Sequence, residues 1–213
     1  MRGKVTNRRP DPLSDHYRTL RERVEFRQKI ERSEFLGIAF PCVTDELFFA
    51  ELKLIEKKHF DASHHCWAFR LFAGGDVRQR STDAGEPSGT AGKPILSAIE
   101  GADLYDTAVV VVRWFGGMKL GTGGLSRAYR DTAAETLKRA QVVDRFVYDR
   151  FRVRVPFDML GAAYRLADPP HVLLAGEEFG EVNEFLFDVR RSRSTEFARL
   201  LAEKRFAFTP PQQ

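Results

Sequence analysis

The chain has 213 residues and a formal net charge of +4, from 34 basic and 30 acidic side chains. This length allows one large domain or two small ones. Hydrophobic residues make up 43% of the chain and include 18 Phe, which is enough for folded cores and excludes a disordered polymer. The basic balance permits binding to nucleic acid or to an acidic partner but does not require it.

Residues 1–16 are predicted to form a basic, flexible tail. They contain four basic residues and are not followed by an apolar stretch, which excludes a signal peptide. No apolar run of the chain approaches the roughly 20 residues that cross a bilayer. The two cysteines, Cys42 and Cys66, do not form the dense pattern of a secreted disulfide scaffold. We therefore expect a cytoplasmic protein with no membrane partner.

Residues 17–142 are predicted to form the first domain, which begins with two strands and a helix. Polar and apolar side chains alternate within Tyr17–Ile30, the period of two that is typical of a half-buried strand. A short apolar run, Phe35–Phe40, predicts the next strand. Thr44 stands before two acidic residues, which indicates a helix N-terminus, and this helix is expected to end near Lys58.

The rest of this domain is predicted to contain three strands and two helices. Alternation over His65–Phe72 predicts a strand, which a Gly-Gly turn connects to a short strand at Val77–Arg80. Pro94 suits the first turn of a helix. The uninterrupted β-branched run Val109–Val112 predicts a central strand. Apolar residues at helical spacing over Leu125–Ala140 predict the last helix of the domain.

Residues 143–213 are predicted to form the second domain, with a strand-helix-strand-strand-helix-strand order. That order is typical of a ferredoxin-like module. The chain as a whole is therefore predicted to be an α+β protein. The elements expected in the second domain are, in chain order, Phe146–Val155, Pro156–Ala167, His171–Ala175, Glu181–Val189, Ser194–Lys204 and Phe206–Phe208.

A first loop, Thr82–Gly92, is rich in Gly, Pro and small polar residues and leads directly into a helix. Glycines allow a ligand to approach the backbone, and the amides at a helix N-terminus attract anions. Lys93 adds a positive charge. The loop is not a P-loop, because Pro87 replaces a required glycine and Pro94 stands where Ser or Thr would hold magnesium. The alternative is a tight connection whose glycines serve packing.

A second loop, Gly116–Gly124, leaves the central strand and enters the next helix, which is again a geometry that receives phosphate. Its glycine spacing does not match a dinucleotide-binding fingerprint. If the two loops meet at one end of a sheet, they form a single polar pocket or groove. We predict an anion-binding surface composed of Ser88, Gly89, Thr90, Gly92, Lys93, Arg113, Gly116, Gly117, Lys119, Gly121, Thr122, Gly123, Gly124, Arg127 and Arg130.

Catalytic and metal-binding residues are weakly indicated. Asp83 and Glu86 in the first loop, and His64 before it, are weak candidates for an acid or base, but loop acids usually face solvent or cap helices. His64 and Cys66 lie on the same face of a strand and could share a metal or form a nucleophilic pair. No second cluster with ligand spacing exists, and a buried Cys usually behaves as a small hydrophobe. We assign no catalytic residue, no metal and no cofactor.

Three blocks of sequence, His64–Ala68, Gly85–Pro94 and Arg113–Gly121, together resemble the YigZ/IMPACT family, also called UPF0029. The resemblance covers about 33–140, and the part from Phe146 is similar to the second domain of the bacterial two-domain YigZ type. Two departures from the family pattern are Ala84, where a second Asp is usual, and Trp114, where Tyr is usual. The first departure weakens any mechanism that needs paired carboxylates in the loop.

The resemblance implies a ribosomal protein S5 domain 2-like fold for the first domain and an elongation factor G-like, ferredoxin-like second domain. It also implies a link to translation, because eukaryotic relatives belong to a regulator that competes for an activator of a starvation-sensing kinase. That binding mode is not expected here, because no RWD domain precedes the matched region in this sequence. Bacterial members have no settled biochemical activity.

The leading hypothesis is a non-enzymatic factor that associates with RNA or the ribosome and takes part in the regulation of translation. Its anion-binding surface would contact phosphates. One alternative is an enzyme whose pocket receives a small phosphorylated or acidic substrate, with Asp83, Glu86 or His64 as acid or base. Another is a protein-interaction module whose pocket holds a peptide.

Overall fold

A computed structural model describes residues 15–73 and 76–209, which fold into two compact units. The first unit comprises residues 17–145. The second comprises residues 146–209 together with Asp15 and His16. The predicted boundary between the domains lay between residues 142 and 143, and the predicted tail covers 1–16, of which 1–14 lie outside the described residues.

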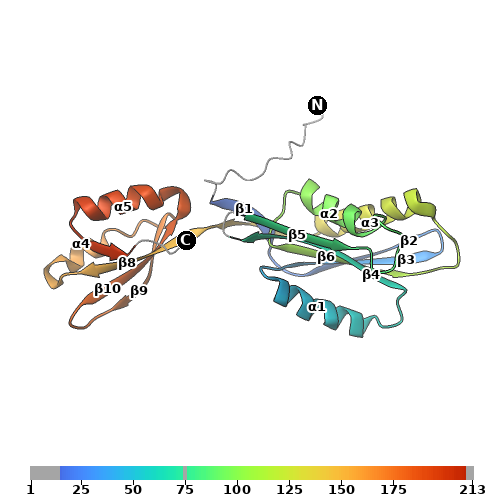
Figure 1. Ribbon diagram of the computed structural model, residues 1–213, viewed down its shortest axis with the longest axis horizontal. Coiled ribbons are helices and arrows are strands. Elements are labelled where there is room, and N and C mark those ends of the chain that lie inside the picture. The colour runs from blue at the N-terminus through green and yellow to red at the C-terminus, as the bar shows by residue number, and fades with distance from the viewer. Residues whose placement is uncertain (1–14, 74–75, 210–213) are drawn as a thin grey trace, which may run out of the picture. The chain divides into compact units, whose positions relative to one another are not determined.

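The first unit is built on a five-stranded antiparallel sheet (Figure 1). Its central strand contains the β-branched run Val109–Val112, for which a central strand was predicted, and all four valines are buried. The strands are, in spatial order, β2 (Val24–Ile30), β3 (Ser33–Pro41), β6 (Thr107–Trp114), β4 (His64–Ala73) and β5 (Asp76–Thr82).

Helices cover both faces of this sheet, as Figure 1 shows. One face packs against α2 (Gly92–Gly101) and α3 (Gly121–Lys138), and the other packs against α1 (Asp45–Lys58). Side chains of a strand point alternately to the two faces. Val109 and Val111 of β6 therefore enter the core under α2 and α3, whereas the intervening valines enter the core under α1.

The N-termini of α1 and α3 differ in how they are formed. Thr44 caps α1, where its hydroxyl accepts a hydrogen bond from the backbone N–H of Leu47, as its position before two acids predicted. The prediction for α3 was wrong at its start, because the helix begins at Gly121 rather than Leu125. Gly121 has a φ of 68°, a left-handed conformation that glycine adopts readily, so the chain can turn into the helix at this residue. The residues predicted as the end of a loop are thus the first helical turn.

The region predicted as a single strand from residue 17 to residue 30 is two strands. β1 (His16–Leu20) is separated from β2 by a bend at residues 21–23 and pairs with β7 (Val142–Phe146) in a two-stranded sheet. The regular alternation is confined to β2, and the three residues of the bend, Arg21, Glu22 and Arg23, are all charged and exposed. Leu20 at the end of β1 is buried in the core of the first unit.

The second unit has the predicted order of elements, and its antiparallel sheet has the strand order β11-β8-β10-β9. The predicted helix over 156–167 is a 3₁₀ turn (Phe157–Met159) followed by a short helix. The predicted first strand begins two residues later than expected, because Phe146 ends β7. The elements are β8 (Tyr148–Val155), α4 (Leu160–Tyr164), β9 (Val172–Glu178), β10 (Asn183–Arg190), α5 (Ser194–Glu203) and β11 (Ala207–Thr209).

A buried carboxylate joins the start of the described chain to the second unit. Asp15 is 3% exposed and accepts hydrogen bonds from Arg190 Nη2 (2.7 Å), Arg190 Nε (3.1 Å) and the Ser192 hydroxyl (2.5 Å). Burial alone raises the pKa of Asp15, but the hydrogen bonds from Arg190 and Ser192 and the charge of Arg190 outweigh it and lower this pKa to about 2.

We expect Asp15→Asn to lower the free energy of unfolding of the second unit at pH 7 by about 2 kcal/mol. A carboxyl whose pKa is lowered by folding stabilises the fold above its unfolded pKa, and this contribution disappears as the pH falls through the folded value. The difference between wild type and variant should therefore shrink between about pH 4 and pH 2. Urea titrations followed by far-ultraviolet circular dichroism at several pH values test this, and a pH-independent difference would contradict it.

Candidate functional site

The first glycine-rich loop is organised by the side chain of Asp83. Its Oδ2 accepts a hydrogen bond from the backbone N–H of Gly89 (2.8 Å), and its Oδ1 accepts from Ala91 (2.8 Å) and Gly92 (2.9 Å). Burial alone raises the pKa of Asp83, but these three N–H groups and the nearby charge of Lys93 lower it below its usual value. The carboxylate therefore remains ionised and binds the loop together.

This arrangement changes the interpretation of the first loop. The N–H groups that were expected to receive a ligand anion, including those of Gly89 and Gly92, already bind the carboxylate of Asp83. The hydroxyl of Thr90 donates to the carbonyl of Pro87 (2.6 Å) and is buried. Gly92 also has a packing role, because a Cβ there would approach the backbone of Thr82 to 2.8 Å. The anion at the start of α2 is thus supplied by the chain itself.

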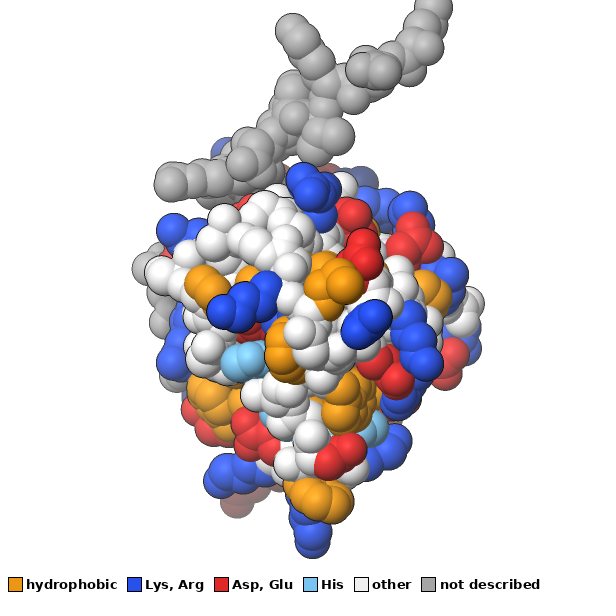
Figure 2. Space-filling view, turned by 90° about the vertical axis from the view of Figure 1, so that its right-hand side faces the viewer, with side chains coloured by type: hydrophobic (Ala, Val, Ile, Leu, Met, Phe, Trp, Pro, Cys, Tyr) orange, Lys and Arg blue, Asp and Glu red, His pale blue; other side chains and the backbone are white. Residues whose placement is uncertain are grey.

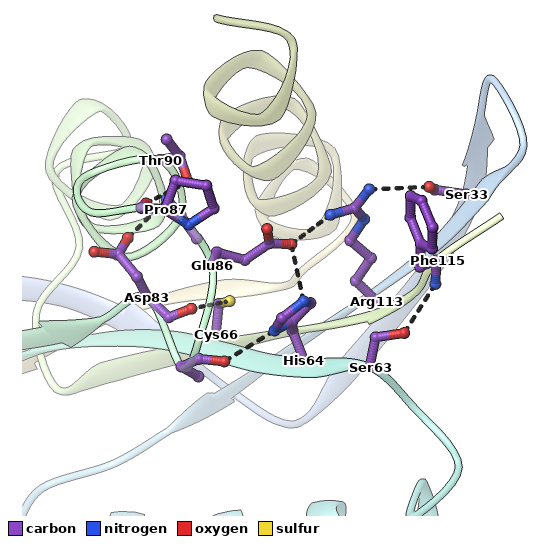
Figure 3. Close-up of polar contacts among 12 residues, drawn as sticks. Ser33, Ser63, His64, Cys66, Asp83, Glu86, Pro87, Thr90, Arg113 and Phe115 are labelled. Carbon is purple, nitrogen blue, oxygen red and sulfur yellow. Dashed lines mark hydrogen bonds and ion pairs between the residues drawn. The ribbon is translucent and has the colours of Figure 1, made fainter. Parts of the chain in front are cut away.

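Glu86 is the centre of a second, buried network (Figure 3). Its Oε1 accepts hydrogen bonds from Arg113 Nη1 (2.6 Å) and the hydroxyl of Tyr129 (2.7 Å), which come from β6 and α3. The side chains of Glu86 and Arg113 are 3% and 5% exposed, so the pair is shielded from solvent. Burial, followed by the neighbouring Cys66 and Glu86, raises the pKa of Tyr129, which keeps the phenol protonated as a donor.

Arg113 has partners at both terminal guanidinium nitrogens, whereas its buried Nε has no hydrogen-bond partner among the described residues. Its Nη2 donates to the Ser33 hydroxyl at 3.1 Å, and its guanidinium lies 5.5 Å from the ring centre of Phe35 and 5.4 Å from that of Phe115. Arg113 was predicted to bind a ligand anion. The structure instead gives it an internal counter-ion, Glu86.

His64 lies at the edge of this network and is partly exposed. Its Nδ1 is 3.0 Å from the carbonyl oxygen of Ala84, and because a carbonyl can only accept, Nδ1 carries a proton and donates it to this hydrogen bond. Its Nε2 is 3.8 Å from Oε1 of Glu86 (Figure 3). The three weak acid–base candidates thus have different surroundings: Asp83 and Glu86 each hold structural hydrogen bonds, and His64 has a ring nitrogen directed at a carboxylate.

Cys66 is fully buried, and its thiol donates a hydrogen bond to the carbonyl oxygen of Asp83 at 2.9 Å. Burial raises the pKa of Cys66 to about 12, and burial likewise raises the pKa of Cys42 to about 11. A thiol held protonated is a poor nucleophile. Cys66 therefore does not form a nucleophilic pair with His64. Among residues 15–73 and 76–209, no group of three or more His, Cys, Asp and Glu side chains is placed to hold a metal ion.

We expect both thiols to resist modification by a disulfide reagent at pH 8 in the folded protein. Their raised pKa values leave almost no thiolate, which is the reactive form. Titration with such a reagent should detect close to no thiol in buffer and two after unfolding in guanidinium. Rapid modification of one thiol in the native protein would contradict the burial of both cysteines.

The second glycine-rich segment, by contrast, is exposed. Gly117, Gly121 and Gly123 have no atom within 4 Å of the position of an added Cβ, so the surface above them is open. Gly116 differs, because a Cβ there would lie 1.7 Å from the carbonyl oxygen of Arg32 and the glycine is needed for packing. No side chain caps the N-terminus of α3, and its first turn contains no acidic residue. This helix N-terminus retains the polarity that attracts anions.

Basic side chains accompany this segment. Lys119 and Arg127 are exposed and form no ion pair or side-chain hydrogen bond with any residue that the structure describes. Arg130 pairs with its neighbour Asp131 (3.2 Å), and Ser88, Thr122 and Lys93 are exposed. Figure 2 shows blue Lys and Arg side chains distributed among red Asp and Glu, hydrophobic and uncharged side chains on the face that it draws.

The two aromatic residues that follow the central strand also differ. Trp114 is partly buried against the core under α1, and its indole N–H donates to Asp61 at 3.0 Å. Phe115 is 48% exposed, and its backbone N–H donates to the Ser63 hydroxyl. From the sequence, no role was assigned to Ser33 or Ser63, and Tyr129 was placed only within the predicted helix Leu125–Ala140. No local signal marks them, because each contacts a residue far away in sequence.

Comparison with known proteins agrees with this architecture. Residues 31–137 match the family model of the Impact N-terminal domain. The IMPACT family member YvyE of Bacillus subtilis is 33% identical over 187 residues, which cover 88% of this chain and 86% of YvyE. The chain belongs to the IMPACT family.

Other known proteins match part or most of the chain. YigZ of Escherichia coli is 37% identical over 113 residues, covering 53% of this chain and 55% of YigZ. A crystal structure described as a hypothetical protein is 24% identical and covers 93% of this chain and 98% of its own, with a TM-score of 0.67. The resemblance predicted from the three sequence blocks is therefore confirmed, and so is the mixed α+β fold. No helix within the described part of the chain is long and apolar enough to cross a membrane.

Proposed function

We propose that this IMPACT family member is a non-enzymatic factor in the regulation of translation, which binds RNA or the ribosome in the cytoplasm through the start of α3. Membership of the family supports the role in translation. We choose this surface because the N-termini of α2 and α3 differ. The N–H groups at the start of α2 bind Asp83, whereas the start of α3 has no side-chain cap and no acidic residue in its first turn.

The exposed cations give this surface its charge. Lys119 precedes the first turn of α3, and Arg127 lies in the second turn of the helix, six residues after Gly121. Neither has an ionic partner among the described residues, so binding a phosphate would not require an existing ion pair to break. Backbone amides, helix polarity and Lys or Arg side chains are the groups that proteins direct at nucleic-acid phosphates.

The test is binding to purified ribosomes and to structured RNA over a range of salt concentrations. Counterion release predicts an affinity that falls steeply with salt, and Lys119→Ala/Arg127→Ala should weaken binding and lower the salt slope by about one for each phosphate that the variant no longer neutralises. Lys53→Ala on α1 is the matched control, because Lys53 is exposed on the opposite side of the sheet. Absent or salt-insensitive binding would overturn the proposal.

A second candidate is an enzyme that acts on a small phosphorylated or acidic substrate. The arrangement of His64 favours it, because Nε2 faces the buried carboxylate of Glu86 while Nδ1 is held by a carbonyl. Because Nδ1 donates to the Ala84 carbonyl, Nε2 is the nitrogen that would accept a proton from a substrate, and the nearby carboxylate would stabilise the imidazolium that forms. His64 would be the base, the Ala84 carbonyl would position its ring, and Glu86 would stabilise the imidazolium.

This second candidate is tested by screening phosphorylated and acidic metabolites for a rise in the melting temperature of the protein. A specific metabolite should be turned over by wild type and not by His64→Gln, with the melting temperature of the unliganded variant unchanged. Because Glu86 also stabilises the fold, its substitution cannot serve as the diagnostic variant. If no metabolite raises the melting temperature and none is turned over, the enzymatic alternative is wrong. That result would not affect the translation proposal.

A further inference from the structure

A groove of about 400 Å³ lies at one end of the sheet in the second unit. Val155 ends β8 there and pairs with Asn183, which begins β10. The groove is bounded by the residues that follow β8, the turn between β9 and β10, and the start of β11. Its lining residues are Arg154, Val155, Pro156, Phe157, Gly180, Glu181, Val182, Asn183, Arg205 and Ala207.

Apolar side chains are unusually exposed in this groove. Phe157 is 82% exposed and Val182 is 54% exposed, although both line the same depression. Large apolar side chains gathered at a concave surface mark interaction sites in soluble proteins. The second unit has an apolar core that contains several Phe side chains, and Phe157 nevertheless remains exposed.

Two arginines give the groove a positive side. Arg205 is exposed and forms no ion pair with any residue in the described part of the chain. Arg154 approaches Glu184 at 3.7 Å, and the same Glu184 already binds Arg152 at 2.7 Å. One acid, Glu181, also lines the groove. An occupant with one or two carboxylates would complete this charge pattern.

The charge of the whole unit helps to distinguish the classes of macromolecule. Residues 146–213 contain ten acidic and ten basic side chains, and Asp15 adds one acid, so the described second unit has a formal net charge of −1. Nucleic-acid interfaces are strongly positive, whereas the centres of protein interfaces combine aromatic anchors with Arg. The combination of exposed Phe157, exposed Val182 and two arginines on a unit that has no positive net charge favours a protein ligand.

We propose that this groove binds a segment of a partner protein that presents an apolar or aromatic side chain next to a carboxylate. The apolar side chain packs on Phe157 and Val182, and the carboxylate pairs with Arg205, with Arg154 as a second donor. Arg presents paired N–H groups that suit carboxylates. This site lies in the second unit and does not depend on the phosphate-binding surface proposed for the first.

The experiment is the selection of displayed random peptides against the full chain, followed by affinity measurements on the recovered sequences. The selected peptides should share an apolar or aromatic residue within a few positions of Asp or Glu. Phe157→Ser and Arg205→Glu should each weaken their binding at least tenfold, and selection against Arg205→Glu should recover Lys or Arg in place of the acid. Phe60→Ser is the matched control, because Phe60 is 84% exposed but lies in the first unit.

Several outcomes overturn the proposal. If the selected peptides bind Phe157→Ser as tightly as wild type, their binding site lies outside the groove. If the peptides share no acidic residue, Arg205 does not pair with a carboxylate of the ligand. Binding of a single-stranded oligouridylate that is lost in Phe157→Ser assigns the groove to nucleic acid. A concentration-dependent dimer that dissociates in Phe157→Ser assigns it to a second copy of the chain. Because both replaced side chains are exposed, circular dichroism should show the same fold and melting temperature in each variant.

Discussion

Replacing Glu86 by Leu is expected to lower the free energy of unfolding of the first unit by about 3–5 kcal/mol, because it leaves the charge of Arg113 buried without a counter-ion. The hydroxyl of Tyr129 loses its acceptor in the same step. Both tryptophans, Trp67 and Trp114, lie in the first unit, so tryptophan fluorescence during urea titration reports on this unit.

Two control variants separate the buried charge from a general effect of removing a carboxylate. Glu86→Leu/Arg113→Met should be less destabilised than Glu86→Leu alone, because the double change removes both buried charges. Glu135→Ala deletes an exposed acid that pairs with Lys138 and Arg139, and it should change stability by less than about 1 kcal/mol. A loss in Glu86→Leu no larger than that in Glu135→Ala would show that the network does not stabilise the fold.

Replacing Asp83 by Ala is expected to lower the free energy of unfolding of the first unit by about 2–4 kcal/mol, since three backbone N–H groups lose their acceptor at once. The pKa of Asp83 is lowered by these hydrogen bonds, so the contribution is present at neutral pH and is lost as the pH falls below the usual pKa of a carboxyl. Hydrogen exchange of the Gly89, Ala91 and Gly92 amides should accelerate in the variant at pH 7.

The vacated amides also provide a test of the nature of the loop. If they form an anion site that Asp83 occupies, acetate or phosphate in the buffer should restore part of the stability of Asp83→Ala and leave wild type unchanged. Asp131→Ala is the matched control, because Asp131 is exposed and pairs with the adjacent Arg130. Equal stabilisation of all three proteins by the added anion would falsify the idea of an internal anion site.

Much of the fold could be predicted because its signals are local. The buried β-branched run of β6, the alternation of β4 and the cap of α1 each depend on residues that are close in sequence. The order of elements in the second unit was predictable for the same reason. The division of the region from residue 17 to residue 30 was not, because β1 pairs with β7, a strand more than a hundred residues away.

The candidate site was predicted less well for two reasons. Its interactions join residues far apart in sequence, and the glycine-rich loop that suggests an open anion site is filled by a carboxylate of the chain. Glu86 was recognised as a loop acid, but its partners Arg113 and Tyr129 lie 27 and 43 residues further along the chain. The glycine-rich loop before α2 has the composition of an anion site, and composition does not show that Asp83 reaches its amides. The comparable segment before α3 has no such acid, and there the expectation of an open surface stays a prediction.

The buried carboxylate of Asp15 has a consequence for how the protein is made. Since Asp15 belongs to the second unit and residues 17–145 form the first, the first unit is an insertion within the second. During synthesis, Asp15 leaves the ribosome long before Arg190 and Ser192, the residues that bind it. The inserted unit can therefore fold while its host is incomplete. Any truncation that begins at Tyr17 keeps the whole inserted unit and deprives the host of its buried acid.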